Sequence, residues 1–372
     1  MKIALIHDHL IQSGGAEKVL QVFTDIWPQA PIYTLLYEPK NFSAEFNGKQ
    51  VKTSFLQHWP GALKHYQWFL PLMPLATELH DLMDYDVVVS SSSAMAKGVI
   101  TRSNTLHICY CHTPTRYLWS DTHRYVEELR YNRLIKKVVP YFLSHLRSWD
   151  QLAANRVDVF IANSKNVANR IRKYYRRESV VIYPPVATSQ FQIAPVLGKY
   201  FLTGGRLVSY KKFDLTIKAF NRLGIPLKIF GEGPEEKKLR SLAKPNVEFL
   251  GKLSQAELTK FYSQAIAFIH PQIEDFGITA VESMAAGRPV IAYAAGGAQE
   301  TVIENKTGKF FEEQTWEALA DTVVRFKPEI YRPAEIKAYA EKFSIERFKK
   351  EINDLIAVEY QKLKTANLTY PK

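Results

Sequence analysis

Residues 273–291 read IEDFGITAVESMAAGRPVI, and they hold two carboxylates, Glu274 and Glu282, with seven residues between them. A helix that begins near Ile278 places Glu282 one turn inside, while Glu274 stays on the preceding loop. Both carboxylates can then reach one ligand. The first N–H groups of such a helix have no partner within it, so they favour an anion such as a diphosphate. Gly287 ends the helix, and the Pro-Val-Ile that follows opens a strand.

Patterns typical of strands and helices alternate twice along the chain. Alternation of this kind predicts an α/β protein with two parallel sheets, each covered by helices on both faces. Ligands then bind at the carboxyl ends of the strands. Buried strands are predicted at residues 2–7, 87–89, 106–111, 157–163, 180–182, 200–203, 227–230, 247–250, 265–269 and from 289, and helices at 14–27, 165–175, from 212, from 234, 255–263 and 344–364.

The Pro184-Pro185 pair interrupts this alternation, because two prolines neither continue a strand nor enter a helix. We therefore expect an interdomain linker there. At 372 residues the chain is too long for one ordinary core and suits two domains. The predicted boundaries are 1–183 for the first domain, 184–343 for the second, and 344–372 for a terminal amphipathic helix.

The composition describes a globular protein. A hydrophobic content of 46% with 13% aromatic residues excludes disorder. The longest apolar runs fall far short of the ~20 residues that span a bilayer, and residues 1–6 lack the features of a secretion signal. We expect the mature protein to begin at Met1, in the cytoplasm.

The two cysteines, Cys109 and Cys111, lie two apart on a predicted strand and are too close in sequence to cross-link a fold. His107 shares their face of that strand, so a metal site is one interpretation. No second group of ligands accompanies it. Buried thiols on a strand are the simpler interpretation.

The net charge of +12 implies an anionic partner. Two stretches of the chain are rich in basic residues. In the first, residues 124–149, leucine, valine and aromatic residues accompany the basic ones, and this pattern predicts one or two amphipathic helices that lie on anionic lipid. Nucleic acid is the competing partner, but no recognition helix, zinc finger or aromatic RNA-binding motif is present. The alternative interpretation is an ordinary basic surface that is solvated and binds no partner. The basic residues are Arg124, Arg130, Arg133, Lys136, Lys137 and Arg147, followed by Arg170, Arg172, Lys173, Arg176 and Arg177.

Two glycine turns follow predicted strands in the second domain. Residues 204–211 read GGRLVSYK, which places glycines and two cations where a phosphate can bind. Gly231-Glu232-Gly233 resembles the start of a dinucleotide fingerprint. Glu236 stands where the third glycine should be, so a nicotinamide-dependent enzyme is disfavoured. Pro234 is expected at the first position of the next helix.

Residues 273–291 resemble the donor-site signature of the family 4 glycosyltransferases, and five further segments extend the resemblance over nearly the whole chain. The resemblance implies the GT-B fold, in which two Rossmann-like, doubly wound parallel-sheet domains face a central cleft. It also implies transfer with retention of anomeric configuration. No enzymic nucleophile is assigned, since these enzymes are generally described by front-face attack with the departing phosphate oxygen as base.

The resemblance assigns roles within the second domain. Arg206 and Lys211 match the pair that grips the donor diphosphate, although the family often has Gly or Asn where this chain has Lys212. Glu282 is expected to hold the ribose hydroxyls, and Glu274 the sugar. The complete set expected to bind the donor is Gly15, Gly205, Arg206, Lys211, Gly231, Gly233, Lys252, Glu274, Phe276, Gly277, Ile278, Thr279 and Glu282.

In the first domain, residues 112–119 read HTPTRYLW after a buried strand. This segment resembles an element of bacterial O-antigen and exopolysaccharide mannosyltransferases within the family, in which the residue at His112 contacts the transferred sugar. Residues 7–17 match the family's amino-terminal turn, with Glu17 inside the helix that follows. The catalytic residues are therefore expected to be His112, Glu274, Arg206 and Lys211.

Two acidic motifs suggest a metal. Asp84-Tyr85-Asp86 has the form that holds a cation in other transferases, but it precedes a strand and is more simply the polar start of that strand. His7-Asp8-His9 could also bind a metal. Because Arg206 and Lys211 supply the charge that a diphosphate leaving group needs, we expect neither a metal nor another cofactor.

These observations together predict a metal-independent, retaining glycosyltransferase on the inner face of the plasma membrane. GDP-mannose is the favoured donor, with a UDP-hexose or UDP-hexuronate second, and the acceptor is a glycan or lipid-linked glycan in cell-surface polysaccharide synthesis. A sugar-nucleotide epimerase or hydrolase of similar fold and a non-catalytic nucleotide-sugar-binding protein are the alternatives.

Overall fold

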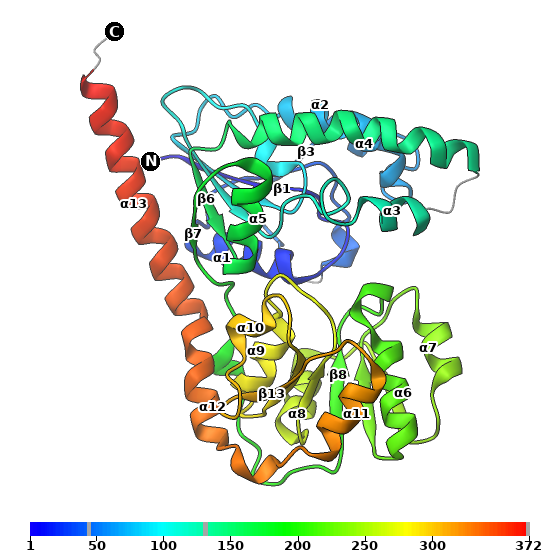
Figure 1. Ribbon diagram of the computed structural model, residues 1–372. Coiled ribbons are helices and arrows are strands. Elements are labelled where there is room, and N and C mark those ends of the chain that lie inside the picture. Colours follow the sequence, from blue (N-terminus) through cyan, green and yellow to red (C-terminus); the bar gives the residue numbers. More distant parts are fainter. Residues whose placement is uncertain (43–45, 129–132, 370–372) are drawn as a thin grey trace. The chain divides into compact units, whose positions relative to one another are not determined.

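The computed structural model describes residues 1–42, 46–128 and 133–369, which form two compact units (Figure 1). Unit 1 comprises Met1–Tyr183 and Phe348–Lys372, and unit 2 comprises Pro184–Arg347. The chain therefore passes from unit 1 to unit 2 at the Pro184-Pro185 pair. It returns after Arg347, inside the last helix, whereas the sequence placed this boundary after residue 343.

Unit 1 contains a sheet of seven parallel strands in the order β3-β2-β1-β4-β5-β6-β7. β1, β4 and β5 are buried along their whole length, as expected for central parallel strands covered on both faces. The strand order reverses between β1 and β4. The strands are β1 Ile3–His7, β2 Ile32–Thr34, β3 Val51–Thr53, β4 Val87–Ser92, β5 Leu106–Cys111, β6 Val159–Ala162 and β7 Ser179–Val181.

Helices cover both faces of this sheet (Figure 1). The last helix, α13, belongs to unit 1 from Phe348 onward. The Phe348 ring packs against Phe23 and Tyr110, with ring centroids 5.5 and 5.6 Å apart. The helices are α1 Gly15–Ile26, α2 Met73–Glu78, α3 Thr122–Glu128, α4 Arg133–Ala154, α5 Lys165–Tyr175 and α13 Ile345–Thr369, with 3-10 turns η1 Pro39–Asn41, η2 Phe55–His58, η3 Tyr66–Leu72 and η4 Ala96–Gly98.

Unit 2 repeats the same strand order on a sheet of six parallel strands, β10-β9-β8-β11-β12-β13, which reverses between β8 and β11. The strands are β8 Phe201–Gly204, β9 Leu227–Phe230, β10 Val247–Gly251, β11 Phe268–His270, β12 Val290–Tyr293 and β13 Gly308–Phe311. The helices are α6 Phe213–Leu223, α7 Glu236–Leu242, α8 Gln255–Gln264, α9 Ile278–Ala285, α10 Ala298–Thr301, α11 Trp316–Val324 and α12 Pro333–Ala340, with 3-10 turns η5 Thr188–Gln190, η6 Ser209–Lys211, η7 Pro328–Ile330 and η8 Glu341–Phe343.

The predicted α/β class with two doubly wound parallel sheets is confirmed. Several element boundaries were wrong: β4 continues to Ser92 and α13 to Thr369, and two other elements begin later than predicted for a clear reason. Pro234 does not begin a helix: the Glu236 N–H donates to the Gly233 carbonyl, so Pro234 lies in a turn and α7 begins two residues later. β11 begins at Phe268 rather than at residue 265, because the Ala265 N–H still donates to a carbonyl of α8.

Candidate functional site

The first candidate site lies at the strand-order reversal of unit 2. β8 leads into the loop that carries Lys211, and β11 leads into the loop that carries Glu274. The Lys211 Nζ lies 2.9 Å from the Glu274 Oε1, and the two side chains are only 11% and 17% exposed. A crevice at the carboxyl ends of two diverging strands is where this class of sheet binds its ligands.

Lys211 and Glu274 each stabilise the ionised form of the other. Burial alone would raise the pKa of Glu274, but Lys211 and then His270 lower it to about 2. Burial alone would lower the pKa of Lys211, but Glu274, Tyr210 and Glu282 raise it above its ordinary value. Both groups are therefore ionised at neutral pH, and Glu282 acts on the same lysine as Glu274.

Sequence reasoning missed two polar residues beside this pair. The Gln272 Nε2 lies 3.2 Å from the His270 Nδ1 and 3.4 Å from the Glu274 Oε1. Burial lowers the pKa of His270 to about 4. The His270 Nε2 and Gln272 Oε1 are buried without a hydrogen-bond partner among the described residues. A polar His-Pro-Gln at a strand end was the signal that could have identified them.

The predicted start of a helix between the two glutamates is confirmed, with α9 beginning at Ile278. Gly277 precedes it with a left-handed φ of +92°, and no described side chain caps the helix. The buried Thr279 hydroxyl has no partner among the described residues. Glu282 is buried on α9, where the Tyr262 hydroxyl donates to its Oε2 at 3.2 Å. Uncapped N–H groups at this helix start can bind an anion.

The predicted glycine turns interlock beside β8 and β9. A Cβ on Gly231 would lie 1.9 Å from the Gly205 carbonyl oxygen, and one on Gly233 would lie 2.3 Å from the Leu207 carbonyl oxygen. Only glycine permits this approach of two backbones. The Gly231 N–H also donates to the Gly251 carbonyl, which places Lys252 directly after the contact.

The structure identifies Lys211 as the lysine that points into this site. Its side chain is buried against Glu274, whereas Lys212 has a left-handed φ of +55° and ends the η6 turn. A left-handed backbone favours Gly or Asn, which is what the resembled family often has at this position. Arg206 is exposed, while Phe276 is buried with its ring 5.5 Å from that of Phe343.

The second candidate site lies at the strand-order reversal of unit 1 and contains His112. The His112 Nε2 lies 2.8 Å from the Ser91 Oγ, which lies 3.1 Å from the His7 Nδ1. The His7 Nε2 in turn lies 3.4 Å from a carboxylate oxygen of Glu17. Gly15, predicted to bind the donor, forms the first position of α1 in this unit.

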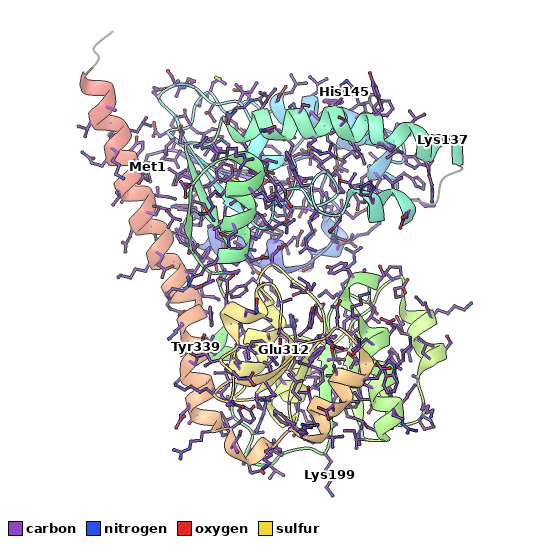
Figure 2. The ribbon with its side chains drawn as sticks, viewed as in Figure 1. Met1, Lys137, His145, Lys199, Glu312 and Tyr339 are labelled. Carbon is purple, nitrogen blue, oxygen red and sulfur yellow. The ribbon has the colours of Figure 1, made fainter. Side chains whose placement is uncertain are left out.

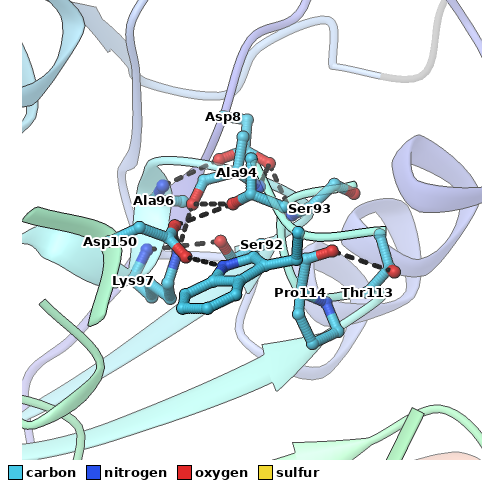
Figure 3. Close-up of polar contacts among 11 residues, drawn as sticks. Asp8, Ser92, Ser93, Ala94, Ala96, Lys97, Thr113, Pro114 and Asp150 are labelled. Atoms are coloured by element: carbon cyan, nitrogen blue, oxygen red, sulfur yellow. Dashed lines mark hydrogen bonds and ion pairs between the residues drawn. The ribbon is translucent and has the colours of Figure 1, made fainter. Parts of the chain in front are cut away.

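A buried ion pair supports the segment that follows His112 (Figure 3). The Lys97 Nζ lies 2.5 Å from Asp150 on α4, and the two side chains are 1% and 0% exposed. Asp150 also accepts hydrogen bonds from the Thr115 hydroxyl at 2.8 Å and the Trp119 indole N–H at 2.7 Å. Thr115 and Trp119 therefore hold this motif to α4 through Asp150.

The motifs that suggested a metal have structural partners. The Asp8 carboxylate accepts hydrogen bonds from the N–H groups of Ser93, Ala94 and Ala96 (Figure 3). Asp86 accepts one from the Lys2 N–H at the start of the sheet. Within residues 1–42, 46–128 and 133–369, no group of three His, Cys, Asp or Glu side chains is placed to hold a metal.

The residues on β5 that suggested a metal site also have a structural explanation. Cys109 and Cys111 are both buried on β5, and the His107 Nε2 pairs with the Ser90 hydroxyl at 2.9 Å. Burial raises the pKa of Cys109 to about 12, so this thiol is not a reactive one.

The basic segment of unit 1 forms the two helices α3 and α4, and the side chains of Arg124, Arg130 and Arg133 lie outside the described part. Lys136 donates to the Glu127 carbonyl and Arg147 to the Leu118 carbonyl, so part of the charge stabilises the local fold. Among the helices that the structure describes, none combines the length and the hydropathy that crossing a bilayer requires.

Two protein-family models match this chain, one over most of unit 1 and one over most of unit 2. Residues 14–190 match the model of the family described as Glycosyltransferase Family 4, and residues 188–343 match Glycosyl transferases group 1. The two matches together run from residue 14, just before α1, to residue 343, at the end of η8 in unit 2. The chain belongs to the family 4 glycosyltransferases.

Relatives within this family include mannosyltransferases. A GDP-mannose-dependent alpha-(1-6)-phosphatidylinositol monomannoside mannosyltransferase from Mycobacterium tuberculosis is 35% identical over 136 residues, which is 32% of this chain and 35% of that protein. Alpha-1,3/1,6-mannosyltransferase ALG2 from Dictyostelium discoideum is 24% identical over 83% of this chain and 85% of that protein. The chain spans about half, or less, of the length of the first curated relatives it matches.

Solved structures of similar proteins share the fold. HepE from Anabaena in complex with UDP-glucose superposes with a TM-score of 0.72 at 18% identity, covering 96% of this chain and all of that one. Because the sequence identity is low, this structural likeness establishes only that the chain has the GT-B fold.

Proposed function

We propose that this protein is a retaining glycosyltransferase that moves a hexosyl group from a nucleotide sugar to a glycan or lipid-linked glycan. GDP-mannose is the favoured donor, because the Mycobacterium tuberculosis relative is named as GDP-mannose-dependent. A UDP-hexose or UDP-hexuronate is the second choice, since HepE was solved with UDP-glucose. Cell-surface polysaccharide synthesis is the proposed setting.

One observation carries the proposal. The Lys211–Glu274 ion pair lies at the strand-order reversal of unit 2, beside the uncapped start of α9. A diphosphate there would gain the Lys211 charge and the N–H groups of α9. Arg206, exposed on the neighbouring loop, supplies a second cation. These groups can neutralise a departing diphosphate without a metal, which we therefore propose is not required.

The remaining groups are assigned to the sugar and the nucleoside. Glu282 on α9 binds the ribose hydroxyls, and Glu274 binds the transferred sugar. His112 orients the sugar from unit 1. In the reaction the bond from the anomeric carbon to the diphosphate oxygen breaks while the acceptor oxygen bonds to that carbon. The acceptor proton passes to the departing phosphate oxygen.

The test is a transfer screen over GDP- and UDP-sugars, with and without membrane extract, followed by calorimetry with GDP and UDP. Arg206→Ala should weaken nucleotide binding by roughly tenfold to a hundredfold, as expected for a charge-assisted hydrogen bond. Glu274→Gln should lower turnover without weakening diphosphate binding. Since Glu274 competes with the diphosphate for Lys211, diphosphate affinity should stay level or increase.

Exposed Lys306→Ala in unit 2, in the turn between the bridged residues Glu304 and Gly308, is the matched control for removal of a cation and should leave binding unchanged. Donor turnover without any acceptor would favour the epimerase or hydrolase alternative. Tight nucleotide binding with no turnover of any donor would favour the non-catalytic one. Loss of GDP and UDP affinity in Glu274→Gln as large as in Arg206→Ala would contradict the assigned roles.

We also propose that unit 1 attaches peripherally to the inner face of the plasma membrane through α4. The α4 surface consists of the exposed Lys137, Val138, Tyr141, Phe142 and His145, which recur at helical spacing on one side. Tyr141 and Phe142 are 65% and 48% exposed, and Figure 2 shows Lys137 and His145 along the outer side of this helix. Aromatic and basic side chains together are typical of helices that lie on anionic lipid.

Cosedimentation with vesicles that contain anionic lipid tests this attachment. Tyr141→Ser with Phe142→Ser should lower the bound fraction severalfold, and Lys137→Gln should reduce it about fivefold at low salt. Val324→Ser, at a residue 69% exposed on α11 of unit 2, is the matched control and should change nothing. Equal binding by all four proteins would remove the α4 surface from the proposal.

A further inference from the structure

A line of hydrogen bonds connects Glu17 to His112 through the carboxyl edge of the unit 1 sheet. The distances are 3.4 Å from Glu17 to His7, 3.1 Å from His7 to Ser91, and 2.8 Å from Ser91 to His112. His7 ends β1 and Ser91 is its register partner on β4, so the line crosses the point where the strand order reverses. His112 directly follows the neighbouring strand β5.

The inner members of this line are buried. His7 is 3% exposed, Glu17 7% and Ser91 0%. Burial alone would raise the pKa of Glu17, but its interactions with His7, led by their hydrogen bond, lower this pKa below its ordinary value. An acidic residue in the first turn of a helix is often explained by the helix dipole alone. That explanation does not account for the direction of the Glu17 side chain toward His7, or for the continuation of the line to His112.

The proton positions along the line follow from the donors and acceptors. An ionised Glu17 only accepts, so the His7 Nε2 must carry the proton. A His7 ring that carries only this one proton presents its Nδ1 as an acceptor, and the single Ser91 hydroxyl proton then points to that nitrogen. The Ser91 oxygen is left to accept from His112. His112 must therefore carry its proton on Nε2.

We propose that His7 carries a single proton, on Nε2, and that Glu17, His7 and Ser91 are positioning residues that hold His112 as the Nε2–H tautomer and leave its Nδ1 unprotonated. An unprotonated Nδ1 accepts a hydrogen bond from a sugar hydroxyl and does not donate one. The inference rests on the proposed function, because it gives His112 its role at the transferred sugar. It adds three residues that act through His112 and contact no substrate themselves.

The tautomer is measured directly by long-range proton–nitrogen NMR on the whole protein with ¹⁵N-labelled histidine, in the absence of any donor. In the wild type the His112 Nε2 should be protonated and its Nδ1 unprotonated. Ser91→Ala should give a mixture of both tautomers, and Glu17→Gln should do the same because an amide can donate as well as accept. Ser91→Thr keeps the hydroxyl and should restore the single tautomer.

Kinetics give the second measurement. Ser91→Ala should lower kcat roughly tenfold, the loss expected for one hydrogen bond, while GDP and UDP affinity stay unchanged. Ser90→Ala is the matched control on the same strand, since the Ser90 hydroxyl pairs with the buried His107 at 2.9 Å. It should cost similar stability and leave both the His112 tautomer and kcat as they are.

The outcomes separate this inference from the proposed function. A wild-type His112 protonated on Nδ1, or a kcat loss in Ser90→Ala equal to that in Ser91→Ala, would overturn the inference even if sugar transfer is observed. An Nε2–H tautomer that depends on Ser91, in a protein that turns over no donor, would support the positioning line and refute the transferase. If Ser91→Ala does not fold, the wild-type tautomer and Ser91→Thr still decide.

Discussion

The two units use one strand order for two kinds of chemistry. At its reversal point, unit 2 places an ion pair, Lys211–Glu274, with side chains 11% and 17% exposed. Unit 1 places a line of hydrogen bonds that runs from Glu17 to His112. Its own ion pair, Lys97–Asp150, lies beneath the site with side chains 1% and 0% exposed. We therefore expect the more exposed pair, Lys211–Glu274, to serve ligand binding and the fully buried pair, Lys97–Asp150, to stabilise the fold.

The backbone near the two sites differs as well. In unit 2 the loops after β8 and β9 approach so closely that Gly231 and Gly233 are required. In unit 1 the corresponding edge is organised by side chains, since Asp8 accepts three backbone N–H bonds and Asp150 accepts three side-chain bonds. We expect mutations to separate stability from function differently in the two units.

The largest expected effect is on the buried ion pair of unit 1. Asp150→Ala leaves the Lys97 charge buried without its carboxylate, which should lower the free energy of unfolding by about 3 to 5 kcal/mol. Glu274→Gln in unit 2 should cost far less, because its partner Lys211 is nearer to water. Urea unfolding of both variants measures the contrast.

The double variant Lys97→Met with Asp150→Leu is the control, since it removes both charges together. It should recover a large part of the lost stability, although the bonds to Thr115 and Trp119 stay broken. If Asp150→Ala and Glu274→Gln lower the free energy of unfolding equally, the exposure of an ion pair does not determine how much breaking it costs.

The sequence predicted the two sheets and the helix start between Glu274 and Glu282, because both depend on local patterns. β1 and β4 begin with the apolar runs IALI and VVV, and β5 is mostly apolar. Glu274 lies on a loop and Glu282 on the helix that follows it, as their spacing predicted. The short strands β2, β3 and β13 have three or four residues each and offer no period to recognise.

Partnerships across long separations could not be predicted. Lys97 and Asp150 are 53 residues apart, and His7 and Ser91 are 84 apart. Only the packing of strands and helices brings them together. His7 and Glu17 were noticed as parts of a motif, but the Ser91 link that gives them a shared role is visible only in the sheet register.

A second prediction concerns acid, and it applies to one buried histidine in each unit. Burial lowers the pKa of His107 in unit 1 and of His270 in unit 2 to about 4. Between pH 6.5 and 4 the unfolded chain therefore binds protons that the folded chain does not, so stability decreases as the pH falls. Each histidine accounts for about 3 kcal/mol over this window.

Unfolding free energies measured at intervals from pH 7 to pH 4 test this, with His107→Gln and His270→Gln for comparison. Each substitution should remove the contribution of its own histidine, about 3 kcal/mol, from the decrease in the free energy of unfolding between pH 6.5 and 4. Glu274, whose pKa is lowered to about 2, adds a further loss that begins only below pH 4.5. A wild-type stability that stays level down to pH 4 would show that neither histidine is held neutral.

A third prediction tests whether the unit 2 loops depend on glycine for space or only for backbone conformation. Gly231→Ala and Gly224→Ala both place a side chain at positive φ, +107° and +69°, but only the first meets another backbone. Gly231→Ala should therefore cost about 1 to 3 kcal/mol more than Gly224→Ala and should also weaken nucleotide binding. Thermal unfolding and GDP calorimetry measure both effects. Equal costs for the two variants would mean that the loops separate easily.

The smallest expected effect is a gain in stability that compares the two units at matched positions. Arg176 at the end of α5 and Lys212 at the end of η6 have left-handed φ values of +57° and +55°. A long side chain in this conformation costs about 1 kcal/mol, and Asn tolerates it better. Arg176→Asn and Lys212→Asn should each therefore raise the free energy of unfolding by about 0.5 to 1 kcal/mol. Turnover should be unchanged in both, because Lys211 and not Lys212 is the buried partner of Glu274. A loss of nucleotide affinity in Lys212→Asn, absent from Arg176→Asn, would instead show that unit 2 uses both lysines at its site.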